Sequence, residues 1–294
     1  MTDNPNIADI MARKAYKIGL LYENEPAINL DELHDRLNTR IGNVQLMSED
    51  ACHFAFLDYG VTYADDSVAP AQCVMTIRDI QPDTGDISEE DIVQSWGWQE
   101  AKAVVECCRS VLEVSDFLAA GLPSKPRLAL FHNIVLAVLD VAPCEAIHWT
   151  PSLHYVEPAD YVRSKSEADP NRPTPRGTLF PAINVRRYDI AGRAPGEKVF
   201  DSIGAADLGV VDVQCHFAGI DQEEVEPIVF KSAFYLFHTG DTIDQETQAS
   251  TLEQHLVRDA ANGVGPAVRW RCSLRSSLAP PNRLVLDLDA GAPI

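Results

Sequence analysis

One predicted strand carries residue types that could do acid–base or metal chemistry. In the run Val211–Phe217, alternation places Asp212, Gln214 and His216 on one face and apolar side chains on the other. An aspartate and a histidine at this spacing can exchange a proton or join the ligand set of a divalent metal. No second cluster completes such a set, so a polar strand face is the preferred interpretation, with no metal and no cofactor. An enzyme with a metal-assisted hydrolytic site at these three residues is the alternative.

The usual catalytic sequence motifs are absent. The chain has no GxSxG, no GxxxxGK[ST], no HExxH and no well-placed GxGxxG. Its seven cysteines are odd in number and include no CxxC pair, so we expect free thiols in a reducing cytoplasm. His148 and His154 flank Trp149, and we interpret them as aromatic residues at the edge of the core. The sequence therefore excludes the common enzyme classes that these motifs mark.

The charge balance favours a binding role. The 294 residues carry 24 Lys and Arg against 44 Asp and Glu, a formal net charge of −20. Such a surface repels nucleic acid and anionic lipid and attracts cationic partners. Some of the acids begin predicted helices, where they also complement the helix dipole. The acids that we expect to contact a basic partner are Asp65, Asp66, Glu89, Glu90, Glu223 and Glu224.

One segment interrupts the acidic chain. Residues 151–200 carry six acids and eight bases, together with several prolines. Arginines scattered in such a segment usually pair with acids of the same body, which is the interpretation we prefer. The alternative is a specific anion site, for which the candidates are Arg172, Arg176, Arg186 and Arg187.

Hydrophobic periodicity and capping signals predict the elements that must position these residues. In the first half we expect strands at 17–22, 44–47, 53–63, 72–78 and 145–150, and helices after Asn29, after Ser88 and at 128–139. The apolar residues in 104–118 fit both the helical and the strand period, and we favour a strand at 109–115. In the second half we expect strands at 183–188, 198–202, 210–217, 269–274 and 283–288, and a helix from Asp221 to Gly240.

The order of these elements predicts an α+β fold. We expect two related lobes of mainly antiparallel sheet with helices packed on one face, ferredoxin-like in character. The N-terminal lobe is placed at 1–156, a proline-rich linker or loop at 157–177, and the C-terminal lobe at 178–294. The first residues show no secretory signal, and the most apolar segment, 128–142, is too short to span a bilayer. We therefore expect a cytoplasmic protein.

Five sequence segments occur in a recognisable order. They are Ser95–Ala101, Glu145–Trp149, Pro181–Arg186, Asp201–Asp212 and Phe234–Asp244. The ordered set resembles an uncharacterised bacterial family, domain of unknown function 4261, over roughly residues 70–250. The resemblance implies a bacterial cytosolic α+β protein with no established enzymatic activity. Members of such families are often neighbours of secreted toxin genes, as candidate immunity proteins.

Together these features predict a non-enzymatic acidic binding protein. We expect an immunity-type neutraliser of a cationic bacterial toxin or secreted effector, with a basic protein as its partner. Nucleic acid and membranes are not expected as partners. Besides the enzyme described above, an adaptor or chaperone for a secreted effector remains an alternative.

Overall fold

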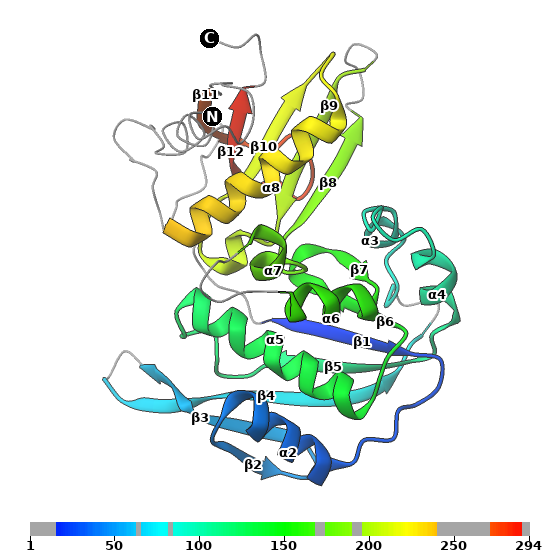
Figure 1. Ribbon diagram of the computed structural model, residues 1–294, viewed down its shortest axis with the longest axis vertical. Coiled ribbons are helices and arrows are strands. Elements are labelled where there is room, and N and C mark those ends of the chain that lie inside the picture. The colour runs from blue at the N-terminus through cyan, green and yellow to red at the C-terminus, as the bar shows by residue number, and fades with distance from the viewer. Residues whose placement is uncertain are drawn as a thin grey trace. The chain divides into compact units, whose positions relative to one another are not determined.

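Two β-sheets organise the chain, and each belongs to its own unit (Figure 1). The computed structural model describes residues 16–62, 66–81, 85–167, 174–189, 196–239 and 271–289. The first unit holds Lys14–Ala182, and the second unit contains the residues from Ile183 onward. Each unit is described by itself below.

The first unit is built on a seven-stranded sheet. Its strands are β1 (Lys17–Tyr22), β2 (Val44–Ser48), β3 (His53–Thr62), β4 (Val68–Asp79), β5 (Ser110–Asp116), β6 (Ala146–Trp149) and β7 (His154–Val156). They lie in the order β2-β3-β4-β5-β1-β6-β7, and every neighbouring pair is antiparallel. The long central strands place apolar side chains such as Ile18 and Leu20 on a fully buried face.

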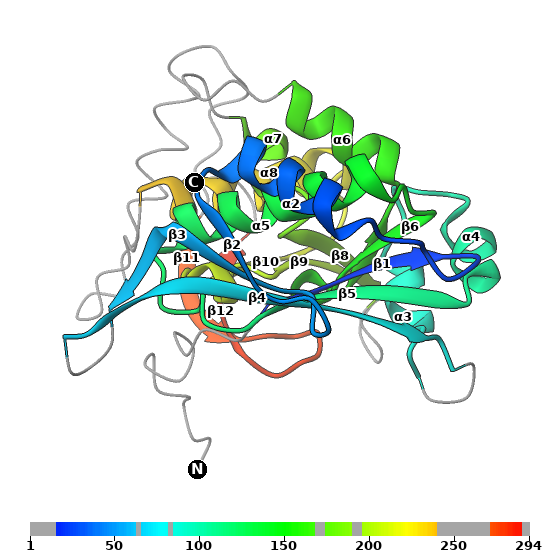
Figure 2. The ribbon, with the colours of Figure 1, turned by 90° about the horizontal axis from the view of Figure 1, so that it is seen from below.

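Helices cover this sheet unequally. The helices of the first unit are α2 (Leu30–Ile41), α3 (Glu89–Val93), α4 (Ala101–Cys107), α5 (Ser124–Val141), α6 (Pro158–Ser166) and α7 (Pro175–Leu179). Figure 2 shows α2, α5 and α6 on one side of the strands. On that side Phe131 of α5 packs edge-on against Tyr16, just before β1. The opposite face is covered near β6 and β7, where Ile92 of α3 and Val104 of α4 pack against a buried cluster that includes Leu21.

The second unit is built on a five-stranded sheet. Its elements are β8 (Asn184–Asp189), β9 (Lys198–Ile203), β10 (Asp212–Phe217), α8 (Gln222–Thr239), β11 (Arg271–Ser276) and β12 (Leu284–Asp289). The strand order is β11-β12-β10-β9-β8, with β10 and β12 parallel and the other neighbours antiparallel. Helix α8 packs against β8, β9 and β10.

The α+β class with mainly antiparallel sheets, predicted from the sequence, is confirmed. The first helix shows why local signals suffice there, because the side chain of Asn29 accepts hydrogen bonds from the backbone amides of Asp31 and Glu32. Gly42 ends this helix with a φ of 111°, a conformation that glycine adopts without strain. The likeness of the two lobes and their ferredoxin-like character stay predictions.

One expectation needs correction. The segment 157–177, expected to be a linker or loop, contains α6 and the start of α7. Pro158 and Pro175 are the first residues of these helices, where a missing amide hydrogen has no cost and the fixed φ suits the helix. The strand favoured within the ambiguous residues 104–118 is confirmed, because β5 spans Ser110–Asp116; α4 ends just before it, at Cys107.

Candidate functional site

Asp212, the first candidate catalytic residue, lies at the start of β10, and its carboxylate is hydrogen-bonded to neighbouring groups of the chain. Its carboxylate accepts hydrogen bonds from Nε of Arg283 at 3.0 Å, from Oγ of Ser202 at 3.2 Å and from the amide of Ala205 at 3.0 Å. Burial raises the pKa of Asp212, and the neighbouring Arg283 opposes that shift. A carboxylate held in this way by three donors of its own unit is anchored rather than open to a substrate.

The other two candidates on β10 also have partners within the second unit. The amide group of Gln214 donates to Oδ1 of Asp287 at 2.9 Å, and its oxygen accepts from the amide of Leu278 at 2.7 Å. Nε2 of the half-buried His216 lies 2.9 Å from a carboxylate oxygen of Glu197. Asp212, Gln214 and His216 therefore share a strand, as predicted, but each binds a different neighbour.

Arg186, a candidate for an anion site, is part of a buried ion network on this sheet. Its guanidinium donates to Asp201 at 2.7 Å, and Arg283 donates to the same carboxylate at 2.6 Å and to Asp212 at 3.0 Å. Asp201 and Arg186 are opposite each other on β9 and β8. Two arginines thus balance two aspartates. Arg186 also donates to the carbonyl of Pro280, which ties the segment between β11 and β12 to the network.

The remaining candidates for an anion site do not join Arg186. Arg187 donates to Glu226 at 2.6 Å, and as the next residue on β8 it points to the other face of the sheet. Arg176, in the first unit, pairs with Asp160. Arg172 lies outside the described residues. Arg176 and Arg187 thus pair with acids of their own unit, which was the preferred interpretation of the basic segment.

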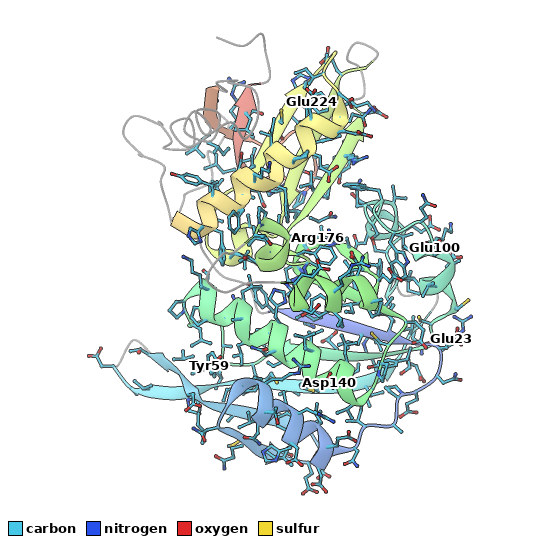
Figure 3. The ribbon with its side chains drawn as sticks, in the orientation of Figure 1. Glu23, Tyr59, Glu100, Asp140, Arg176 and Glu224 are labelled. Carbon is cyan, nitrogen blue, oxygen red and sulfur yellow. The ribbon has the colours of Figure 1, made fainter. Side chains whose placement is uncertain are left out.

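The acids expected to contact a basic partner are exposed wherever the structure describes them. Asp65 lies outside the described residues. The five others stand at the β3–β4 hairpin, in the first turn of α3 and in the first turn of α8 (Figure 3 labels one of them). They are Asp66, Glu89, Glu90, Glu223 and Glu224. The first three belong to the first unit and the last two to the second, so no single unit gathers them all.

A pair that sequence reasoning missed joins α3 to the sheet of the first unit. Oδ2 of Asp91 lies 2.8 Å from Nε2 of His148, whose ring stacks on Tyr155 with 4.3 Å between ring centroids. The helix predicted after Ser88 does begin there, and the amide of Asp91 donates to Oγ of Ser88. The carboxylate instead reaches β6. Only the pairing of distant elements reveals this contact, because 57 residues separate the two side chains.

A second unpredicted cluster lies among α5, α6 and α7. Nζ of Lys165 donates to the carbonyls of Gly177, at 3.0 Å, and of Phe180, and lies 3.1 Å from Nε2 of His132. The other ring nitrogen of His132 is 3.0 Å from the hydroxyl of Tyr161. Burial lowers the pKa of Lys165 to about 7 and holds that of His132 well below its usual range. The cluster connects three helices through a single amine.

Within the described residues, no group of three or more histidine, cysteine, aspartate or glutamate side chains is arranged to hold a metal ion. None of the described helices is long and apolar enough to cross a bilayer. Comparison of the chain with protein-family models, with curated proteins and with solved structures finds no match. The family resemblance therefore stays a prediction, and the proposals below rest on the chain itself.

Proposed function

We propose that this chain is a non-enzymatic binding protein that neutralises a basic bacterial toxin or secreted effector, in the manner of an immunity protein. The observation that carries the proposal is how the chain uses its positive charges. A net charge of −20 could in principle be offset locally by a patch of free bases. In the described residues, most of the bases are instead bound to acids of the same chain.

The internal ion pairs account for most of the described lysines and arginines. Acids of the chain lie within ion-pair distance of Lys17, Arg36, Arg40, Arg78, Lys102, Arg127, Arg163, Arg176, Arg186, Arg187, Lys198, Arg275 and Arg283. Each such ion pair has almost no net charge when it is felt from a distance. The field around the molecule is therefore dominated by the acids that remain.

Several of the remaining acids are exposed on both units. Glu23 and Glu100 lie on the side of the first unit that carries α4, as Figure 3 shows, and neither forms an ion pair among the described residues. Glu223 and Glu224 are exposed in the first turn of α8 and have no basic partner in the described part of the chain. Uncompensated surface acids of this kind accelerate encounter with a cationic protein over about one Debye length, roughly 8–10 Å at ordinary salt.

The alternative enzyme has a physical obstacle in the second unit. Its acid, Asp212, would have to leave Arg283, Ser202 and the amide of Ala205 before it could accept a proton or a metal. Release of Asp212 would remove one of the two carboxylates that Arg283 binds and leave only its pair with Asp201. Leaving a buried charge incompletely paired costs free energy. The binding role requires no such rearrangement.

The proposal is tested with the product of whichever neighbouring gene in the native genome encodes a basic protein. Binding is measured by calorimetry at low and at moderate salt, and the toxicity of that product is measured with and without this chain. We expect binding that weakens as salt rises, and loss of toxicity. Inhibition supports neutralisation, whereas stabilisation without inhibition supports the adaptor alternative. Absence of binding at low salt would overturn the proposed function.

Charge-reversal variants locate the contact. We expect Glu89→Lys with Glu90→Lys, or Glu223→Lys with Glu224→Lys, to slow association by about tenfold, since steering follows local charge. Glu49→Lys with Asp50→Lys is the matched control, because both acids are exposed in a turn and the charge change is the same. Equal effects of the control and both test variants would show that the predicted residues are not the contact.

A further inference from the structure

Two apolar side chains are exposed close together in the chain, on α3 and the turn that follows it. Val93, the last residue of α3, is 70% exposed, and Trp96 is 38% exposed. Glu89 lies four residues before Val93, on the same side of the helix. An exposed valine alone would need no explanation, but a tryptophan three residues later adds a large apolar ring to the same stretch. Burial of this surface by a partner would therefore stabilise a complex.

The inner side of the same stretch is held against the sheet of the first unit. Oδ2 of Asp91 lies 2.8 Å from Nε2 of His148, and Oγ of Ser95 accepts a hydrogen bond from the amide of Tyr155 at 2.8 Å. Trp98 packs against a buried apolar cluster. The exposed side chains thus stand on a fixed backbone, so binding does not have to order this part of the chain.

The charged groups around this surface are mostly acids. Residues 86–107 contain six acids and one base, Lys102. Lys102, on α4, lies 3.9 Å from Glu89 and 3.6 Å from Glu106, so the two acids share one cation. Glu100, which directly precedes α4 and is labelled in Figure 3, is exposed and forms no ion pair among the described residues. The contact between Glu89 and Lys102 also places the start of α3 beside α4, so acids of both helices border one surface.

Two of the six acids do not contribute to the exposed charge. Asp91 is buried, and Asp86 forms an ion pair with Arg78. The next base in the chain, Arg109, donates to backbone carbonyls at the end of α4. Four glutamates remain against Lys102 and Arg109, so the surface is negative.

The charge of the surface decides which occupant it accepts. The four glutamates repel nucleic acid and anionic lipid, and a second copy of this chain would bring the same acids against one another. A basic segment gains both from the acids and from the ring of Trp96, because an indole face attracts a lysine or arginine cation. Gly97 adds room beside that ring. A Cβ built at Gly97 meets no atom within 4 Å beyond its neighbours in the chain, so a partner backbone can approach.

We propose that Val93, Trp96 and the glutamates beside them form a surface that binds a basic segment of a protein partner. A lysine or arginine of the segment lies over the indole of Trp96, and an apolar side chain next to it packs on Val93. Glu89 and Glu100 bind the cations that flank these two contacts. The proposal rests on the proposed function, since it names the surface and the kind of segment by which a basic partner is recognised.

The test uses two fluorescein-labelled synthetic peptides of about 12 residues that carry the same charge. One alternates arginine with leucine, and the other alternates arginine with serine. Binding to the full chain is followed by fluorescence anisotropy, and circular dichroism checks that each variant is folded. We expect the arginine–leucine peptide to bind about fivefold more tightly, because only this peptide adds apolar contact to the charge attraction. Equal binding of the two peptides would overturn the proposal.

Trp96→Ala should weaken binding of the arginine–leucine peptide by about tenfold, as is usual for an aromatic anchor. Phe117→Ala is the matched control. Phe117 is also an exposed aromatic residue of the first unit, at 58%, but it follows the end of β5, whereas α4 precedes the start of that strand. We expect the control to change binding by less than about twofold. Equal effects of the two substitutions would contradict the proposed surface.

Two milder substitutions keep the test decisive if Trp96→Ala fails to fold. Val93→Ser should weaken binding by about threefold, whereas Val68→Ser, at a similarly exposed valine at the start of β4, should leave it unchanged. Glu100→Gln should also weaken binding by about threefold. Asp35→Asn removes the same charge from an exposed acid of α2 and should have a smaller effect. Losses of equal size in the test and control variants would overturn the proposal.

The outcomes separate this inference from the proposed function. If the native basic partner is bound and neutralised, but Trp96→Ala and Phe117→Ala affect its binding equally, the surface proposal is overturned and the binding role stands. Failure of the native partner to bind at low salt would overturn the proposed function itself, whatever the two peptides do.

Discussion

The amine of Lys165 lies 3.1 Å from Nε2 of His132, and burial disfavours the charged form of both groups. The same amine donates to the carbonyls of Gly177 and Phe180, at the end of α7. Carbonyls at a helix end have no partner in their own helix, and a lysine is a suitable donor to them. Lys165, a residue of α6, therefore caps the end of α7. In this position its amine loses part of its hydration.

This position makes the stability of the protein depend on pH above neutrality. The pKa of Lys165 falls from 10.5 to about 7 on folding, so the unfolded chain binds more protons between these values. The free energy of unfolding should then rise with pH through that window. Between about pH 7 and pH 9 we expect the contribution of Lys165 to be about 2–3 kcal/mol.

The variant Lys165→Met tests this dependence by urea unfolding at the two pH values. Its stability should be lower overall, because two carbonyls lose a donor, but the rise with pH should be smaller than in the wild type. Cysteines and tyrosines with raised pKa values oppose the rise equally in both proteins, so the difference isolates Lys165. Parallel pH profiles of the two proteins would contradict the prediction.

A buried histidine should govern the response of the first unit to acid. Burial lowers the pKa of His154 from 6.5 to about 3, and its Nδ1 lies 3.1 Å from Oγ of Ser152. Between these pH values the unfolded chain binds more protons, so stability is lost as the pH falls from 6.5 towards 3. At about pH 5 we expect His154 to account for a loss of about 2 kcal/mol relative to neutral pH.

His154→Gln should therefore lose less stability between pH 7 and pH 5 than the wild type, as measured by thermal unfolding. His53→Gln is the control, because His53 is only half-buried at the start of β3. His132, which is also buried with a lowered pKa, leaves some acid sensitivity in both variants. An acid response of His154→Gln as steep as that of the control would refute the assignment.

Local signals in the sequence are sufficient for many elements and insufficient for the contacts between them. The cap at Asn29 and the alternation along 211–217 are properties of neighbouring residues, so α2 and β10 are predictable. The partner of Asp212 is Arg283, 71 residues later, and it reaches Asp212 only because β12 runs parallel to β10. No local pattern contains that register. The sequence of the second unit therefore predicts polar positions on its strands, but not the buried ion network that these side chains form.

Proline content misled the interpretation of the central segment for a related reason. Proline interrupts a helix in its interior but not in its first turn, and Pro158 and Pro175 both occupy first positions. A cue for the start of α6 was present, since acidic Asp160 lies in its first turn and Arg163 and Lys165 in its last. What places α6 on the unit is the burial of Tyr161 against His132, which depends on α5.

The network in the second unit should be sensitive to the loss of Arg283. Arg283 is the only described side chain that donates to both Asp201 and Asp212, so Arg283→Met leaves Asp212 as a buried carboxylate without its cation. We expect a loss of about 3–5 kcal/mol, the usual consequence of removing one partner from a buried pair. Urea unfolding followed by circular dichroism measures it.

Arg275→Met provides the comparison on the adjacent strand. Arg275 is largely exposed, and its Nε lies 3.7 Å from Asp287, so its removal should cost less than about 1 kcal/mol. Similar unfolding midpoints for the two variants would mean that Arg283 is no more important than a surface arginine. A large loss confined to Arg283→Met would establish the network as a structural core.

The alternative enzyme makes a separate prediction about metal content. Asp212, Gln214 and His216 each bind a protein neighbour, so the untagged protein should carry far less than one zinc, manganese or magnesium per chain after purification without chelator. His216→Ala should leave that content unchanged, because its ring nitrogen faces Glu197 rather than the other two side chains. Elemental analysis by mass spectrometry provides the readout, and His34→Ala is the control for a general loss of imidazole. A stoichiometric metal that disappears in His216→Ala alone would restore the enzyme hypothesis and require Asp212 to exchange Arg283 for the ion.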